Sequence, residues 1–298
     1  MSSGSHRHPA AWWKTAPNGA VDCLLCPRKC RIKSGCYGAC SVRCNEQGKL
    51  YSTAYGYPVA MHVDPIEKKP LANFLPGTAT FSFGTFGCNL FCSFCQNASL
   101  SRGNYNLRHE FEYYSPETLV DLAFKHNCKS IAFTYNEPTV FGEYMFDTAQ
   151  IAKERGLATV MVSNGFITQN AARDIYPLID AANIDMKGFS EEFYVKMTKS
   201  HLQPVLDSIK YLNKLGKHIE LTNLVIPGYN DADEMINDYL DWVEKELNKD
   251  VTLHFSAYHP DYMFKKAPAT PRDTLFKIRD HAESRGFTSI QLGNISLH

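Results

Sequence analysis

Residues 80–95 read Thr-Phe-Ser-Phe-Gly-Thr-Phe-Gly-Cys-Asn-Leu-Phe-Cys-Ser-Phe-Cys. The first half is rich in β-branched and aromatic residues, which predicts a strand over Thr80–Phe86. The second half places Cys88, Cys92 and Cys95 in a C-x3-C-x2-C triplet. Three thiolates in one loop can hold three irons of a [4Fe–4S] cluster, whereas electron-carrier clusters are normally closed by four cysteines. The triplet therefore predicts an iron with an open position, as catalytic metals require.

The distribution of cysteines supports a metal-binding protein. Taken alone, the triplet also fits a zinc knuckle or a disulfide pair. Of the ten cysteines, six lie between Cys23 and Cys44, three form the triplet, and Cys128 stands alone. A secreted disulfide scaffold would be shorter and would carry an export signal, which residues 1–13 do not resemble. We therefore expect metal ligands in a reducing, cytoplasmic environment.

Composition excludes several classes of function. A chain of 298 residues that is 44% hydrophobic can form one large α/β domain with an appendage, or two domains. Lys+Arg and Asp+Glu are both 31, so no attraction to nucleic acid or to a membrane surface is expected. No apolar run approaches the roughly 20 residues that span a bilayer.

Short apolar runs alternate with amphipathic segments after residue 79, which indicates a parallel sheet with right-handed crossovers. Six or seven βα units are fewer than the eight of a closed barrel. We therefore predict an α/β fold, a partial (β/α)6 TIM-like barrel at 79–298, preceded by an N-terminal Cys-rich metal-binding module and connector at 1–78. The strands are expected at 80–86, 130–134, 158–163, 182–186, 219–226, 252–257 and 288–292, and the helices at 115–126, 140–154, 168–176, 190–197, 203–215, 232–247 and 270–284.

Polar residues follow successive strands of this barrel, at the ends where chemistry collects. Tyr135 and Glu137 follow the second strand, although this segment also fits a helix start. Asn164 follows the third strand, where Asn-Gly also favours an ordinary turn. Asp185 and Lys187 end the fourth strand on one face, where two opposite charges need each other or a ligand.

The spacing of the N-terminal cysteines indicates a second metal site. Residues 20–50 are too short and too polar to form a core, so a metal would have to order them. Four thiolates can close a structural zinc site or an auxiliary iron–sulfur cluster. Both alternatives stay open.

The triplet, with an aromatic residue before its last cysteine, resembles the signature of radical S-adenosylmethionine (SAM) enzymes. The strand-end segments resemble those of glycyl-radical activases. The motifs of residues 23–30, 38–43, 63–70 and 74–77 make the chain similar to the AmmeMemoRadiSam system radical SAM enzymes, a family that resembles pyruvate formate-lyase activating enzymes. The resemblance runs from about residue 20 to the C-terminus.

This resemblance implies a [4Fe–4S] cluster on Cys88, Cys92 and Cys95, with SAM on its open iron. It implies that Glu137 accepts from the SAM ammonium, although Tyr135 and Asn136 replace the two glycines of the family's Gly-Gly-Glu-Pro-like segment. The residues implied to contact other parts of SAM are Asn164, Asp185, Lys187 and the backbone at Ile226. The cysteines that match the family's N-terminal pattern are Cys23, Cys26, Cys30 and Cys40, whereas Cys36 and Cys44 look additional.

The expected activity is reductive cleavage of SAM and abstraction of a hydrogen atom from a protein or peptide. Modification of a small molecule or RNA is an alternative, although the neutral charge disfavours RNA. A non-enzymatic iron–sulfur or zinc adaptor for Memo-like partners is another. The resemblance further implies Memo-like and AMMECR-like proteins as partners, and we expect a flavodoxin- or ferredoxin-type electron donor.

Overall fold

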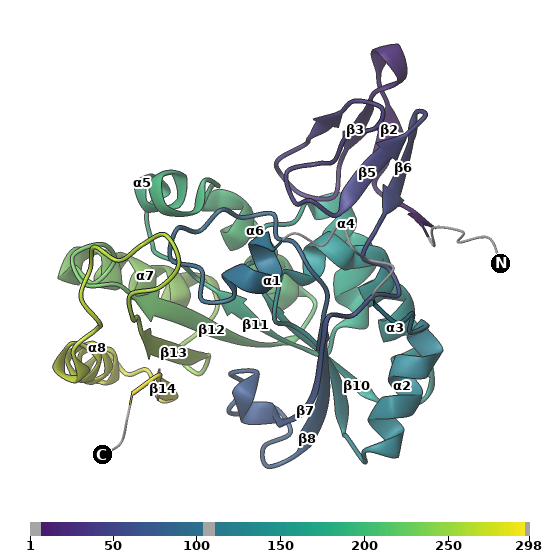
Figure 1. Cartoon of the computed structure of the whole chain (residues 1–298). Coiled ribbons are helices and arrows are strands. Elements are labelled where there is room, and N and C mark those ends of the chain that lie inside the picture. The colour runs from purple at the N-terminus through teal and green to yellow at the C-terminus, as the bar shows by residue number, and fades with distance from the viewer. Residues whose placement is uncertain (1–6, 104–110, 296–298) are drawn as a thin grey trace.

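The computed structural model of the chain describes residues 7–103 and 111–295. Its centre is an eight-stranded sheet in the order β14-β13-β12-β11-β10-β9-β8-β7 (Figure 1). The strands from β8 to β14 are parallel to their neighbours, whereas β7 is antiparallel to β8. The sheet has open edges at β7 and β14, which confirms a partial barrel. The strand bounds are β7 Ala60–Pro65, β8 Ala79–Gly84, β9 Ser130–Phe133, β10 Ala158–Ser163, β11 Ala181–Asp185, β12 His218–Val225, β13 Thr252–Ala257 and β14 Ile290–Gly293.

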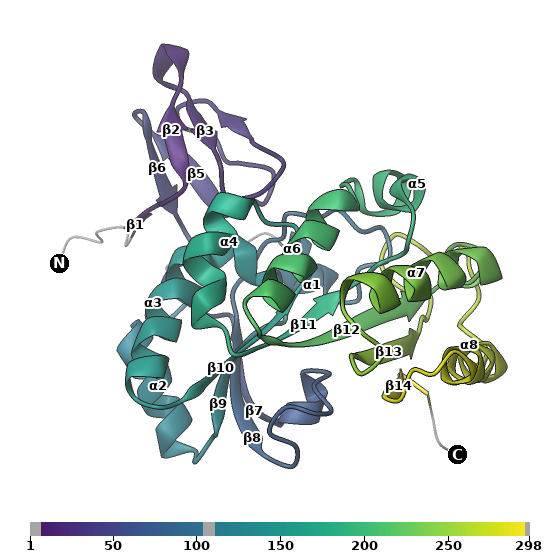
Figure 2. The ribbon, with the colours of Figure 1, turned by 180° about the vertical axis from the view of Figure 1, so that it is seen from behind.

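Helices connect the parallel strands, and Figure 2 shows α2, α3, α4, α6 and α7 on one face of the sheet. Two of the helices begin where the sequence predicts, at 115 and 168, and each has a side-chain cap. Ser115 accepts from the Thr118 amide at the start of α2, and Thr168 accepts from the Ala171 amide at the start of α4. The helix bounds are α1 Ala98–Arg102, α2 Pro116–Lys125, α3 Gly142–Glu154, α4 Gln169–Ile175, α5 Glu191–Phe193, α6 Gln203–Lys214, α7 Asp233–Glu246 and α8 Arg272–Ser284. Three short helical turns lie next to these helices: the 3₁₀ turns η4 Pro138–Phe141 and η5 Tyr176–Leu178, and the π-helical turn η6 Tyr194–Thr198.

The proline-rich stretch before the triplet holds a strand that the sequence analysis missed. Strand β7 pairs with β8 at the edge of the large sheet, with Val63 opposite Phe81. Its prolines hid it, because a proline breaks a central strand but is tolerated on an edge. After β7 the chain passes through η2 (Ile66–Lys68) and returns to β8.

A buried carboxylate fastens this returning segment to the barrel. Glu220 on β12 has no solvent exposure. Its oxygens accept from the backbone amides of Ala72 and Asn73 at 2.9 Å each. They also contact Nε2 of His218 at 2.9 Å and Nε2 of His254 at 2.5 Å. Glu220 therefore helps to hold residues 70–74 against the barrel. Asn73 Nδ2, which donates to Thr252 Oγ1 and Ser289 Oγ, and Asn183 Nδ2, which donates to the Pro70 carbonyl, hold the same segment.

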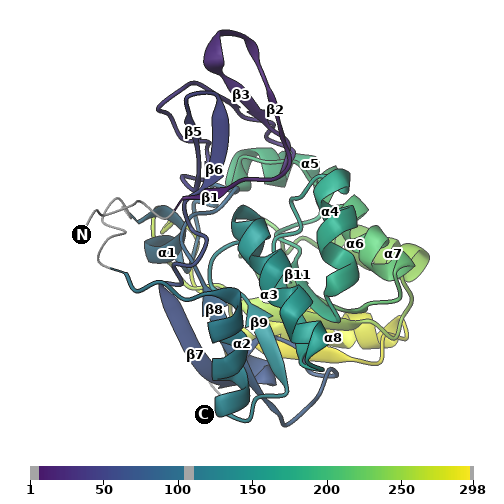
Figure 3. The same cartoon turned by 90° about the vertical axis from the view of Figure 1, so that its right-hand side faces the viewer.

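The N-terminal residues form a small lobe of two three-stranded sheets that stands apart from the large sheet (Figure 3). Arg43 is 1% exposed and forms an ion pair with Glu143 of α3 at 2.8 Å. This buried pair joins the lobe to the barrel. The elements of the lobe are β1 His8–Pro9, β2 Trp13–Thr15, η1 Pro17–Gly19, β3 Val21–Cys23, β4 Arg31–Ile32, β5 Arg43–Glu46 and β6 Lys49–Ser52. Across the described ranges, no helix has the length and apolar character needed to cross a membrane.

Candidate active site

The cysteine triplet lies on the loop that leaves β8 at the carboxyl end of the sheet. The backbone amides of Phe91 and Ser93 donate to carbonyls of η6, at 2.9 and 3.2 Å. No disulfide joins any of the ten cysteines, all of which lie in the described residues, so the loop is not closed by a disulfide. Neighbouring backbone therefore holds the loop in place, without help from a covalent link.

A cavity of about 390 Å³ opens beneath this loop. The three cysteines face it together with nearly all of the strand-end residues that the sequence singled out. Ile226 is absent from its walls; its side chain is fully buried, and its amide donates to Asn230 Oδ1 at 2.6 Å. The predicted residues on the walls are Cys88, Cys92, Cys95, Tyr135, Glu137, Asn164, Asp185 and Lys187.

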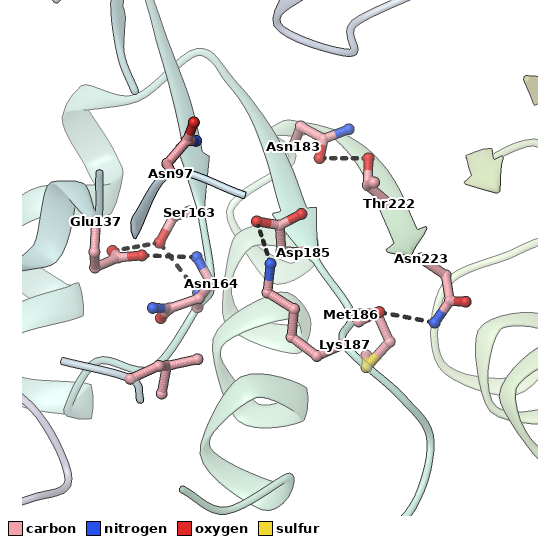
Figure 4. Close-up of polar contacts among 12 residues, drawn as sticks. Asn97, Glu137, Ser163, Asn164, Asn183, Asp185, Met186, Lys187, Thr222 and Asn223 are labelled. Atoms are coloured by element: carbon pink, nitrogen blue, oxygen red, sulfur yellow. Dashed lines mark hydrogen bonds and ion pairs between the residues drawn. The ribbon is translucent and has the colours of Figure 1, made fainter. Parts of the chain in front are cut away.

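Glu137 is tied to its own chain more fully than the sequence suggests. Its Oε1 accepts from the Thr139 amide and the Ser163 hydroxyl, and its Oε2 accepts from the Asn164 amide, each at 2.8 Å (Figure 4). Burial raises the pKa of this carboxyl, against the lowering effect of these hydrogen bonds. The carboxylate thus joins the ends of β9 and β10, and it begins η4 as a cap.

Asn164 links the end of β10 to the cysteine loop. Its Nδ2 donates to Asn89 Oδ1 at 2.9 Å and lies 3.8 Å from Cys88 Sγ. Its Oδ1 accepts from the Phe166 amide at 2.8 Å. The side chain is 5% exposed, so its position is fixed by these bonds.

Asp185 and Lys187 form the ion pair that the alternation of β11 predicts. Asp185 Oδ2 and Lys187 Nζ are 2.9 Å apart, and both side chains keep part of their surface open to the cavity (Figure 4). Burial alone would lower the pKa of Lys187, but the nearby charges of Asp185 and Cys92 outweigh it and raise the pKa. Lys187 therefore presents a permanent cation beside the cysteine loop.

Tyr135 is held in a backbone conformation that favours glycine, with φ of 72°. Its hydroxyl donates to Asp64 Oδ2 at 2.9 Å, and Lys69 Nζ lies 2.8 Å from the same oxygen and 4.5 Å from the Tyr135 ring centroid. Asp64 and Lys69 come from β7 and the segment after it, and Lys69 lines the cavity. The sequence analysis missed both, because they lie in the stretch interpreted as a connector.

Asn136 is a third residue whose role the sequence did not reveal. Its Oδ1 accepts from the Thr85 amide at 2.9 Å, and its Nδ2 donates to the Gly87 carbonyl at 2.9 Å. These bonds tie the end of β9 to the start of the cysteine loop. The fit is close, because a Cβ on Gly84 would lie 2.3 Å from the Thr134 carbonyl oxygen. The replacement of a family glycine by Asn136 was the one feature of the sequence that could have indicated this role.

The donor set of the cavity fits a cluster with one open position. Burial raises the pKa of the Cys88 thiol well above its usual range and that of Cys92 to about 12. A bound metal removes such protons, because it favours the thiolate. Three thiolates can thus ligate three irons, while Lys187, Asp185 and Asn164 lie on the same walls and suit an amino acid zwitterion.

Four N-terminal cysteines line a second, smaller cavity together with Arg43 and Asn89: Cys23, Cys26, Cys30 and Cys40. Cys36 is exposed and Cys44 is buried elsewhere in β5. Within the described part of the chain, no three Cys, His, Asp or Glu side chains are grouped so that they could hold one metal ion. The two cavities adjoin, because Asn89 lines the smaller one and its neighbours Cys88 and Leu90 line the larger one. The lobe and the loop also approach closely, since a Cβ on Gly87 (φ +83°) would lie 2.4 Å from the Cys40 carbonyl oxygen.

Comparison with known proteins identifies relatives of this chain. The sequence profile of the Radical SAM superfamily matches residues 83–240. The chain is 40% identical over 291 residues to the uncharacterized protein MJ0808 of Methanocaldococcus jannaschii, which covers 97% of this chain and 86% of that protein. It is 24% identical over 166 residues to the pyruvate formate-lyase-activating enzyme of Clostridium pasteurianum, which covers 54% of this chain and 67% of that enzyme.

Among solved structures, Streptococcus suis SuiB bound to its precursor peptide SuiA is similar with a TM-score of 0.56 and 14% identity. The match covers 72% of this chain and 48% of SuiB, and it supports the fold. A radical SAM methyltransferase from Sphaerobacter thermophilus gives a TM-score of 0.54 at 12% identity, with coverage of 74% and 68%. Because the profile of the Radical SAM superfamily matches more than half of the chain, the chain belongs to the radical SAM superfamily, and this membership implies a [4Fe–4S] cluster and SAM.

Proposed function

We propose that this protein reductively cleaves SAM and abstracts a hydrogen atom from a protein or peptide substrate, as an activase does. The observation that carries the proposal is the convergence of the three cysteines with Asn164, Asp185 and Lys187 on one cavity. The cluster supplies the electron and one open coordination position when bound. The chain's own residues bind, orient and shield the substrate.

The charged side chains of the cavity suit the amino acid part of SAM. Lys187 offers a cation for the carboxylate of SAM, and Asp185 offers an anion beside it. Asn164 keeps a fixed position next to Cys88. Glu137 already accepts three hydrogen bonds from the chain. Its main role in this proposal is therefore to shape the site, and it is not the sole acceptor for the SAM ammonium.

A protein or peptide substrate is favoured by the open edge of the sheet between β7 and β14. Such an opening lets a loop of another chain approach from the side of the sheet. The similarity to the pyruvate formate-lyase-activating enzyme of Clostridium pasteurianum points the same way. Memo-like and AMMECR-like proteins are the first partners to test.

Anaerobic SAM cleavage tests the proposal. Reconstituted protein with dithionite and SAM should yield 5′-deoxyadenosine, and Cys92→Ala should abolish the product. Cys36→Ala is the matched control, because Cys36 is exposed and lies outside both cavities. Absence of product from the fully reconstituted wild type would contradict the proposal and favour a metal-binding adaptor. Deuterium transfer into 5′-deoxyadenosine from labelled candidate proteins, small molecules or RNA then identifies the substrate class.

We also propose that Cys23, Cys26, Cys30 and Cys40 hold a second metal group. The side chain of Arg43, which lines the same cavity, supports this proposal. Its Nε is buried and lacks a hydrogen-bond partner among the described residues. A buried unpaired N–H is costly, and a sulfur acceptor would satisfy it. The group is zinc or an auxiliary cluster. Binding of either one would draw the four thiols closer together, since no three of them are grouped to hold one metal ion in the part of the chain that the structure describes. Iron analysis separates them, since about four irons per chain fit zinc and about eight fit a second [4Fe–4S] cluster.

A further inference from the structure

We propose that the part of the cavity next to β7 binds a carboxylate of the peptide substrate. We call this part the lysine end, and it consists of Lys68 and Lys69 with the two side chains that brace them, Asp64 and Tyr135. The inference rests on the function proposed above, because it names a chemical feature of the substrate of that reaction. It adds that the segment of the substrate that enters the cavity is acidic.

The lysine end lies at the edge of the sheet where the substrate is proposed to enter. Strand β7 is that edge, Asp64 lies on it, and the two lysines follow it at the end of η2 and just after. Both lysines line the cavity that the cysteine triplet also lines. The side chain of Lys68 is 69% exposed, whereas that of Lys69 is 4% exposed. The two cations therefore lead from the surface into the cavity.

Lys69 keeps a hydrogen bond available for a ligand. Its Nζ donates to Asp64 Oδ2 at 2.8 Å and to the Tyr135 hydroxyl at 3.5 Å. An ammonium group has three N–H bonds to donate, so one of them has no partner among the described residues. A buried N–H without an acceptor is costly. Because Lys69 lines the cavity, an oxygen of a bound substrate would satisfy it.

The charges of the lysine end do not cancel. Asp64 forms ion pairs with both lysines, at 2.8 Å to Lys69 and at 3.5 Å to Lys68. Burial alone would raise the pKa of Asp64, but hydrogen bonds from Lys69 and Tyr135 lower it to about 2, so it is a carboxylate at neutral pH. Two cations thus share one anion. The single positive charge in excess suits the single negative charge of a carboxylate better than a doubly charged phosphate ester.

The lysine end is distinct from the part of the cavity that suits SAM. Burial lowers the pKa of Lys69, and the charges that act on it among the described residues are those of Asp64 and Lys68. Burial also opposes the ammonium form of Lys187, but Asp185 and two cysteines of the triplet raise its pKa. Each lysine therefore has its own charged neighbours. Lys187 remains free for SAM, and Lys69 for the substrate.

Tyr135 holds the lysine end in place. Its ring centroid lies 4.5 Å from Lys69 Nζ, and its hydroxyl donates to Asp64 at 2.9 Å. The residue makes these contacts with a backbone φ of 72°, which is unfavourable for a tyrosine. Residues held in such conformations cluster at ligand-binding sites. Tyr135 is therefore a positioning residue that aims Lys69 into the cavity.

Two short peptides test the charge preference. Both consist of alanine and glycine with blocked ends, and they differ only in a central glutamate or glutamine. Their binding is measured by titration calorimetry on reconstituted protein with SAM and without reductant. The wild type should bind the glutamate peptide roughly 10- to 100-fold more tightly than the glutamine peptide, since a hydrogen bond to a charged group contributes that much.

Variants of the two lysines should reduce this ratio of affinities. Lys68→Gln changes an exposed side chain and should lower the ratio by roughly two- to fivefold. Lys69→Met combined with Asp64→Asn should bring the ratio close to one. The double substitution avoids a buried carboxylate without its cation, which would destabilise the fold. Tyr135→Phe should also lower the ratio and leave the affinity for the glutamine peptide unchanged, a result that a purely structural role would not produce.

Lys196→Gln is the matched control for Lys68→Gln. The side chain of Lys196 is 70% exposed and pairs with Glu192 at the same spacing along the chain as Lys68 and Asp64, but it is absent from the cavity walls. The ratio should stay at its wild-type value in this variant. Because the assay needs no turnover, it still tests the lysine end if the wild type fails to cleave SAM. The two proposals therefore fail separately.

A further peptide identifies the source of the carboxylate. The glutamine peptide with a free C-terminus should bind as tightly as the blocked glutamate peptide if the substrate offers the end of its chain, and weakly if it offers an acidic side chain. Equal affinity of the wild type for the two blocked peptides, or no binding of the glutamate peptide at millimolar concentration, would overturn the proposal.

Three other results would assign the lysine end to a different ligand and would also overturn the proposal. A tenfold rise in the KM for SAM in either lysine variant, measured without peptide, would assign the lysines to SAM. A phosphoserine peptide that binds more than tenfold more tightly than the glutamate peptide would replace the carboxylate with a phosphate. Binding of a short RNA that is lost in Lys68→Gln would replace the peptide with a nucleic acid.

Discussion

Replacing Glu220 with glutamine removes the charge that fastens residues 70–74 to the barrel. Burial alone would raise the pKa of Glu220, but hydrogen bonds from His218, His254 and the two backbone amides lower it from 4.5 to about 2. A fall of that size means that the folded protein favours the carboxylate over the neutral form by about 3 kcal/mol. Glutamine resembles the neutral form, so Glu220→Gln should lower the free energy of unfolding by about 3 kcal/mol at pH 7.

The pH dependence provides a sharper test of the same reasoning. Because the folded pKa lies below the unfolded one, the unfolded chain takes up the proton first as the pH falls. The stabilising contribution of Glu220 is therefore complete above about pH 5, and it is lost progressively from pH 4.5 toward pH 2. The difference in stability between wild type and Glu220→Gln should be constant near neutrality and should shrink over that acidic range.

Urea denaturation followed by tryptophan fluorescence measures this difference, and hydrogen exchange at the Ala72 and Asn73 amides localises it. Glu234→Gln is the control, since Glu234 is exposed in the first turn of α7 and its loss should cost less than about 1 kcal/mol. A Glu220→Gln protein within 0.5 kcal/mol of wild type, or unchanged protection at both amides, would refute the assigned role.

Three further substitutions test other parts of the structure. Lys187→Gln removes the cation offered to the SAM carboxylate, a contact worth about 1.5–3 kcal/mol. The KM for SAM should therefore rise by roughly 10- to 100-fold in a 5′-deoxyadenosine assay. An unchanged KM would show that Lys187 does not bind SAM. Asn136→Ala removes both hydrogen bonds between the end of β9 and the cysteine loop. SAM cleavage should fall by about tenfold or more, while the free energy of unfolding in urea should fall by only about 1–2 kcal/mol. Cleavage at the wild-type rate would contradict the positioning role of Asn136. Arg43→Met leaves the carboxylate of Glu143 buried without its cation, so thermal denaturation should show that the free energy of unfolding falls by about 3–5 kcal/mol. A fall below 1 kcal/mol would show that Glu143 finds another partner.

The sequence predicted the barrel well because its signals are local. The Ser115 and Thr168 caps and the apolar runs of β10 and β13 define elements without reference to the rest of the chain. The parallel order follows from the alternation of strands and helices. The same logic placed Glu137, Asn164, Asp185 and Lys187 at one edge, where they now line one cavity.

What the sequence did not reveal depends on distant pairing. Strand β7 lies among prolines, and only its register with β8 makes it a strand. Asp64 and Lys69 reach Tyr135 from the far side of β8, a contact that no local spacing encodes. The oxygens of Glu137 are occupied by Ser163 and Asn164, which the chain order alone could not show.

The close approach of Gly87 to the backbone of Cys40 limits how this protein can change in evolution. There is no room for even a methyl group between the N-terminal lobe and the start of the cysteine loop. A lobe grafted onto the barrel of another superfamily member would seat only where that barrel also carries glycine at this contact. We therefore expect the lobe and the loop to be inherited as a matched pair, and recombination between relatives to preserve the junction.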